Sequence, residues 1–129
     1  MHFFLRYWLP VVLLCLAIYV QSAFPTLDVF PPVAWSDKLA HMMVYGLLGA
    51  LFCRAFGGHA RWRGRWGFLF LFGVTAATLY GASDEWHQSF VAQRTAEWAD
   101  LAADFAGSAI GCGLHLVGRF RKRTRSGVP

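Results

Sequence analysis

Residues 98–118 read WADLAADFAGSAIGCGLHLVG, a mostly apolar run that opens with two carboxylates. Its apolar part, 101–117, has about 17 residues, the low end of what crosses the hydrocarbon core of a bilayer. The helix is therefore expected to extend into its polar flanks. Asp100 and Asp104 are four residues apart and share one helical face. The stretch predicts a transmembrane helix with a polar patch near its start.

Three more stretches have the same apolar character, at 7–23, 39–53 and 67–83. The whole chain is 57% hydrophobic and 15% charged, whereas a soluble domain has about 45–50% and about 25%. Its 129 residues contain no linker and no repeat, which indicates one domain. We therefore expect an all-α integral membrane four-helix bundle, with spans near 7–23, 37–56, 66–83 and 98–118.

Basic and acidic residues lie on opposite sides of this predicted bundle. Ten of the twelve Lys and Arg residues lie before the first span, in the second connection or in the tail: Arg6, Arg54, Arg61, Arg63, Arg65, Arg119, Arg121, Lys122, Arg123 and Arg125. The seven acidic residues lie on the other side: Asp28, Asp37, Asp84, Glu85, Glu97, Asp100 and Asp104. Because Lys and Arg mark cytoplasmic loops, both termini are predicted to be cytoplasmic.

The first apolar stretch also fits a second interpretation. Arg6, an apolar run and Ser22 near its end have the order of a cleaved signal peptide. Cleavage would leave three spans with unchanged inner and outer faces.

The cysteines are Cys15, Cys53 and Cys112, each within or at the end of an apolar stretch and without CxxC spacing. An odd number of scattered cysteines argues against a disulfide framework or a zinc site. We interpret them as small apolar side chains that fill the core.

Polar residues at helical spacing indicate a site on the acidic side. Asp37, His41 and Tyr45 follow one another at intervals of four, so they share a face of the second helix. Ionisable groups inside a membrane helix cost about 2.5–3.5 kcal/mol at mid-bilayer, and they therefore face the protein interior or water. We expect this face to meet that of Asp100 and Asp104, with His41 and Asp104 in direct or one-water contact.

Two cations and two glycines complete the prediction. Lys38 and Arg94 are the two basic residues on the acidic side of the bundle. The side chain of Arg94 is expected to point into the bundle and to pair with Asp100 or Asp104. Gly107 and Gly111 suit close contact with another helix. Less specific interpretations stay open: Asp37 as a helix N-cap, and Asp104 as a structural clamp to His41 or Arg94.

Four motifs together resemble the VanZ-like family over residues 36–113. They are Ser-Asp-Lys-x-x-His-x-x-x-Tyr-x-x-Leu from Ser36, Gly-x-x-Asp-Glu-x-x-Gln-x-Phe from Gly81, Arg94, and Asp-Leu-x-x-Asp-x-x-Gly from Asp100. The resemblance implies a small multipass protein of the bacterial inner membrane, in a family named for low-level teicoplanin resistance. It carries over a ligand-binding set: Asp37, Lys38, His41, Tyr45, Glu85, Gln88, Arg94, Asp100 and Asp104.

The chain departs from this family pattern at two places. Asp104 stands where many members have Asn, and 88–94 lacks the Pro or Gly often found before the Arg. The first departure bears on any role that needs a neutral amide. The second bears on the geometry of the turn.

Three functions remain open from the sequence. The first is recognition of an anionic cell-envelope lipid or lipid-linked wall precursor at the outer leaflet, with Lys38 and Arg94 on phosphate, modulating teicoplanin susceptibility. This function needs no cofactor, and its partners are membrane lipids and not nucleic acid. The second is a hydrolase or transferase acting on such a lipid, with His41, Glu85, Asp100 and Asp104 as catalytic candidates. Only this function calls for Mg²⁺ or Ca²⁺, on the three carboxylates. The third is a structural or partner subunit.

Overall fold

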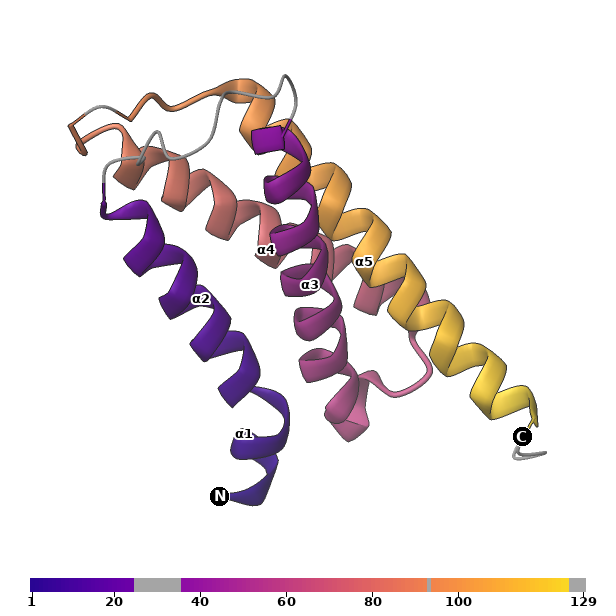
Figure 1. The fold of residues 1–129 in the computed structure, drawn as a ribbon. Helices are drawn as coiled ribbons and strands as arrows, with labels where there is room; N and C mark the ends of the chain where they lie inside the picture. The colour runs from indigo at the N-terminus through magenta and orange to yellow at the C-terminus, as the bar shows by residue number, and fades with distance from the viewer. Residues whose placement is uncertain (25–35, 93, 126–129) are drawn as a thin grey trace.

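The computed structural model describes residues 1–24, 36–92 and 94–125, and within these ranges the chain is helical, without strands. The helices, in chain order, are α1 (His2–Tyr7), α2 (Leu9–Ser22), α3 (Ser36–Gly58), the 3-10 helix η1 (Ala60–Trp62), α4 (Trp66–Gln88) and α5 (Trp98–Arg125) (Figure 1). The all-α prediction is confirmed.

Three of the described helices are long and apolar enough to cross a membrane, namely α3, α4 and α5. α2 is apolar but has only 14 residues. The long helices continue beyond the predicted spans, because their polar ends need not lie in hydrocarbon. In particular, α4 runs to Gln88 and not to 83, so the acidic residues that follow the third apolar stretch are still helical.

The first predicted span, 7–23, corresponds mainly to α2, and Trp8 separates α2 from the short helix α1, which ends at Tyr7. Pro10 stands in the first turn of α2. Proline has no N–H to donate, and its ring collides with the carbonyl group four residues earlier, that of Arg6. A continuous helix through this point is therefore disfavoured.

The helix ends gather at two poles of the molecule. α2 and α4 end, and α3 and α5 begin, at the upper pole in Figure 1, while α1 begins and α5 ends at the lower one. We call the upper pole the acidic end, since Asp37, Asp84, Glu85, Asp100 and Asp104 lie in these helix ends. The common location of the described acidic residues agrees with the sequence analysis, and Asp28 lies outside the described residues. The assignment of the other pole to the cytoplasm stays a prediction from the charges.

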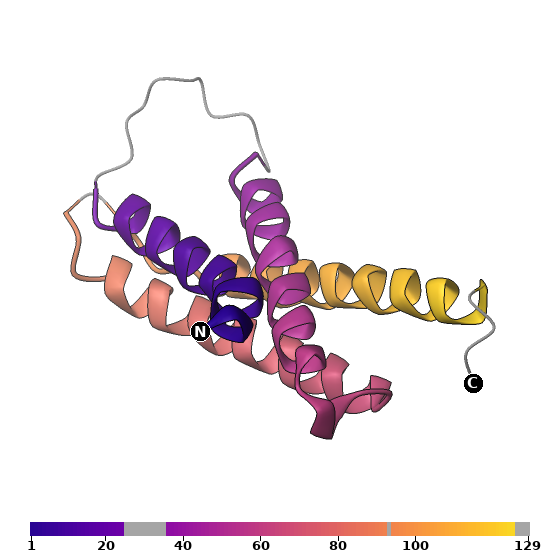
Figure 2. The ribbon, with the colours of Figure 1, turned by 90° about the horizontal axis from the view of Figure 1, so that it is seen from below.

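Glycines bring α3 and α5 into close contact where they cross (Figure 2). A Cβ atom on Gly107 would overlap the backbone of Met42, and one on Gly111 would overlap the backbone of Gly46. A Cβ on Gly49 would lie 2.6 Å from the carbonyl oxygen of Ser108. The prediction that Gly107 and Gly111 lie against another helix is confirmed.

The same interface contains a disulfide bond between Cys53 of α3 and Cys112 of α5, with Cα atoms 5.8 Å apart. Both cysteines are fully buried, and Cys15 is free. The interpretation of all three as apolar filler is therefore wrong for this pair. The partners are 59 residues apart in sequence, and only the close approach of α3 and α5 brings their Cβ atoms within bonding reach.

Candidate functional site

A histidine and an aspartate join α3 and α5 at the acidic end. His41 Nδ1 lies 2.8 Å from Asp104 Oδ1. Asp104 is completely buried, and the His41 side chain is 15% exposed. The predicted direct contact is present, and Asp104 faces the protein interior and not lipid.

Lys38 forms the second connection between the same helices. Its Nζ donates to Asp100 Oδ1 at 2.5 Å and to Glu97 Oε2 at 2.8 Å, and it lies 3.7 Å from Asp37 Oδ2. Lys38 stands in the first turn of α3, opposite the first turn of α5, which explains the pairing. The counter-charge of Asp100 is therefore Lys38 and not Arg94.

Arg94 instead binds the end of α2. Its Nε donates to the Phe24 carbonyl at 3.2 Å, and its Nη2 donates to the Gln21 carbonyl at 3.3 Å. The last carbonyls of a helix lack partners within the helix and attract cations. Within 1–24, 36–92 and 94–125, no ion pair joins Arg94 to a carboxylate. The prediction that it pairs with Asp100 or Asp104 is therefore wrong.

Asp84 is a site residue that the sequence analysis did not select. It is 6% exposed. Its Oδ2 accepts hydrogen bonds from Gln88 Nε2 at 3.0 Å and from the Tyr45 hydroxyl at 3.4 Å. The signal was the interval of four between Asp84 and Gln88, which has meaning only if the third helix continues past 83.

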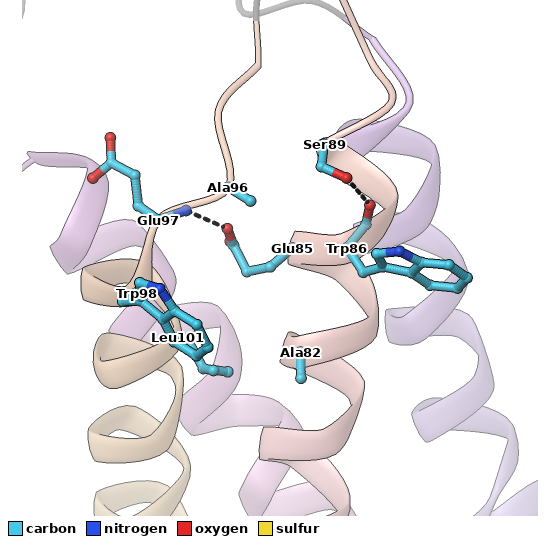
Figure 3. A pocket seen from close by; sticks show the side chains of 8 residues that line it. All are labelled: Ala82, Glu85, Trp86, Ser89, Ala96, Glu97, Trp98 and Leu101. Atoms are coloured by element: carbon cyan, nitrogen blue, oxygen red, sulfur yellow. Dashed lines mark hydrogen bonds between the residues drawn. The ribbon is translucent and has the colours of Figure 1, made fainter.

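Glu85 reaches toward α5 from the other face of α4. Its Oε2 accepts a hydrogen bond from the backbone N–H of Glu97 at 2.9 Å (Figure 3). Its Oε1 is buried without a partner in the described part of the chain, as is Oδ2 of Asp104. One ligand atom each of His41, Glu85 and Asp104 lie within 4.8 Å of one another.

Two cavities flank these groups. The first, the polar cavity, has a volume of about 310 Å³ and lies among α2, α3, α4 and Arg94. Its polar lining residues are Gln21, Asp37, His41, Tyr45, Asp84, Gln88 and Arg94. The second, the apolar groove, has a volume of about 350 Å³ and lies between α4 and α5. Its lining residues are Ala82, Glu85, Trp86, Ser89, Ala96, Glu97, Trp98 and Leu101 (Figure 3).

The structure thus divides the predicted ligand-binding set into three groups. Around the polar cavity lie Asp37, His41, Tyr45, Gln88 and Arg94. Lys38 and Asp100 form an ion pair, and Glu85 and Asp104 meet His41. An imidazole held by a carboxylate, beside a cavity with several acceptors, is able to bind a polar ligand or to exchange a proton with it.

The VanZ/LLP1 family model matches residues 8–119, nearly the whole described chain. The chain belongs to the VanZ/LLP1 family. No curated protein and no solved structure matches it. Membership of the VanZ/LLP1 family, together with three helices able to cross a bilayer, identifies a membrane protein. The match extends the resemblance noted at 36–113 to α2 and, within α5, to residue 119.

Proposed function

We propose that this VanZ/LLP1 protein recognises an anionic cell-envelope lipid or lipid-linked wall precursor at the outer leaflet of the bacterial inner membrane. By holding that lipid, it modulates susceptibility to teicoplanin. The observation that carries the proposal is the polar cavity, about 310 Å³ in volume, at the acidic end of an apolar helical bundle. Its size lies at the low end of the range for small-molecule sites.

The lining of the polar cavity suits a head group with both an anion and hydrogen-bond donors. Arg94 keeps N–H groups beyond the two that hold α2, and these are available to a phosphate oxygen. Asp37 and Asp84 accept hydrogen bonds from sugar hydroxyls or peptide amides. The sequence analysis assigned phosphate binding to both Lys38 and Arg94, but Lys38 already contacts three carboxylates. Arg94 is therefore the residue that binds the phosphate.

The surroundings of the polar cavity favour an amphiphile over a free polar solute. Leu14, Ile18 and Val44 form part of its wall. On the other side of α4, the apolar groove has Trp86 and Trp98 at its edge, and they are 69% and 87% exposed. Exposed tryptophans at the ends of membrane helices lie at the head-group level. The polar group would occupy the cavity while acyl chains lie along the helices.

Arg94→Gln tests the proposal. The wild-type protein, purified in mild detergent, should retain an anionic lipid in native mass spectrometry, and its expression should change teicoplanin susceptibility. Arg94→Gln should lose both effects at equal expression. Arg61→Gln, at the opposite pole, is the matched control and should keep both. Unchanged lipid retention in Arg94→Gln would refute the assignment of the cavity.

A hydrolase or transferase is the second candidate, and the His41–Asp104 contact of 2.8 Å favours it. A carboxylate that orients an imidazole is the usual arrangement of a general base. Purified protein incubated with extracted envelope lipids should then yield new products by mass spectrometry, and His41→Asn should yield none. If variants at His41 lower only thermal stability, the pair acts as a clamp between helices.

A further inference from the structure

Carboxylates outnumber cations at the acidic end. Among the described residues, four carboxylates there are less than one-tenth exposed: Asp84, Glu85, Asp100 and Asp104. Lys38 compensates Asp100, and His41 contacts Asp104. Asp84 has a phenol and an amide as donors, and Glu85 has one backbone N–H. Buried carboxylates without a full counter-charge are costly, so the cluster is suited to a further cation.

Two unpartnered oxygens mark the place for that cation. Within the described ranges, Glu85 Oε1 and Asp104 Oδ2 are buried and accept no hydrogen bond. Glu85 is 7% exposed and Asp104 is 0% exposed. Buried polar atoms in native proteins nearly always have a partner, and a bound ion is one such partner.

The spacing of these groups fits one metal ion. One ligand atom each of His41, Glu85 and Asp104 lie within 4.8 Å of one another. Two ligands of one transition-metal ion, each about 2.0–2.2 Å from it, lie at most about 4.4 Å apart. Small side-chain rotations therefore bring the three atoms onto a common ion.

Gly81 of α4 packs closely against the cluster. A Cβ atom at this position would lie 2.5 Å from Asp104 Oδ2 and 3.1 Å from the Tyr45 ring. Any larger residue would therefore press on the unpartnered oxygen. The glycine thus allows α4 to approach the unpartnered oxygen of Asp104 closely.

We propose that His41, Glu85 and Asp104 form a binding site for a divalent transition-metal ion, Zn²⁺ or Mn²⁺. Imidazole together with carboxylates suits these ions, whereas Mg²⁺ and Ca²⁺ prefer oxygen ligands alone. The set differs from the carboxylates that the sequence suggested, because Asp100 is engaged by Lys38. A second group, Asp37, His41 and Asp100, has similar spacing, but Asp37 is exposed and Asp100 is paired. This inference stands independently of the proposed lipid.

Metal binding by the full chain in detergent tests the site. The protein is stripped with a chelator, dialysed against Zn²⁺ alone or Mn²⁺ alone, and analysed for metal content and thermal unfolding. We expect one ion per chain and a higher unfolding temperature with metal, because the ion binds the folded state. Glu85→Gln and Asp104→Asn should each weaken binding at least tenfold. Glu97→Gln, a nearby carboxylate outside the set, should bind as the wild type does.

A spectroscopic readout on the wild-type protein does not depend on the folding of variants. Electron spin echo modulation of bound Mn²⁺ should detect the nitrogen of one imidazole. The inference is overturned if the wild type binds neither ion, if no nitrogen is coupled, or if Glu85→Gln and Asp104→Asn bind like the wild type. Loss of binding in Asp37→Asn alone would assign the ion to the other group and also overturn it. If the protein retains lipid but binds no metal, the metal site is refuted while the proposed function stands. Failure of the metal site and failure of the proposed function are therefore distinguishable.

Discussion

Gly49→Ala is expected to destabilise the protein through the contact of α3 with α5. The new Cβ would lie 2.6 Å from Ser108 O and 2.8 Å from Ser108 Cα, both backbone atoms. Ordinary contacts between heavy atoms are about 3.5–4.0 Å long, so the helices must separate locally by about 1 Å. The disulfide between Cys53 and Cys112 opposes that movement, because it ties the same two helices one turn away.

Two opposing effects decide the magnitude. Replacing glycine with alanine inside a helix stabilises it by about 1 kcal/mol. Overpacking a close contact costs about 1–3 kcal/mol, and a backbone neighbour that cannot rotate away favours the upper half of that range. We therefore expect a net loss of about 1–2 kcal/mol in the free energy of unfolding.

Gly118→Ala supplies the matched control on α5, since its Cβ would meet nothing within 4 Å. It should leave the free energy of unfolding unchanged or raise it by about 0.5–1 kcal/mol. The assay is unfolding in mixed detergent micelles with increasing sodium dodecyl sulfate, followed by far-ultraviolet circular dichroism. If Gly49→Ala is as stable as the parent protein, close backbone packing of α3 on α5 is the wrong description.

Three further predictions concern topology, charge and thiols. In a chain without the native cysteines, Ala60→Cys should resist an impermeant thiol reagent in intact cells, because the basic connection is predicted to be cytoplasmic. Ala92→Cys, at the acidic end, should react. The reverse labelling would overturn the topology. Lys38→Met should lower the free energy of unfolding by about 1–3 kcal/mol, because it leaves Asp100 unpaired; the loss is smaller than for a fully buried pair, since Lys38 is partly exposed. Adding Asp100→Asn to this variant should restore most of the loss. Equal losses in the single and double variants would contradict the pairing. Thiol titration in denaturant without reductant should find one free thiol per wild-type chain, that of Cys15. Cys53→Ala should show two, because Cys112 loses its partner. Three free thiols in the wild type would exclude the disulfide.

Local sequence patterns determined the helices and much of the site. Apolar stretches predicted α3, α4 and α5, because a bilayer demands length and hydropathy that are readable along the chain. The intervals of four in Asp37–His41 and Asp100–Asp104 are properties of single helices. Since ionisable groups avoid lipid, these intervals were enough to predict that His41 and Asp104 meet. The separation of acidic and basic residues between the poles likewise follows from the order of the spans.

Pairings between distant segments were decided only by the tertiary structure. By charge alone, either Lys38 or Arg94 was able to pair with Asp100. Lys38 forms the ion pair because the first turns of α3 and α5 face each other. Arg94 was directed to α2 by carbonyl groups whose position depends on where α2 ends.

Helix length and interhelical distance account for the remainder. Asp84 entered the site because α4 continues to Gln88, a boundary that polarity alone had placed near 83. The bond between Cys53 and Cys112 depends on the distance between two backbones, which glycines on both helices make short. Residue types along the chain report which groups avoid lipid, whereas the choice of partner depends on the packing of helices far apart in sequence.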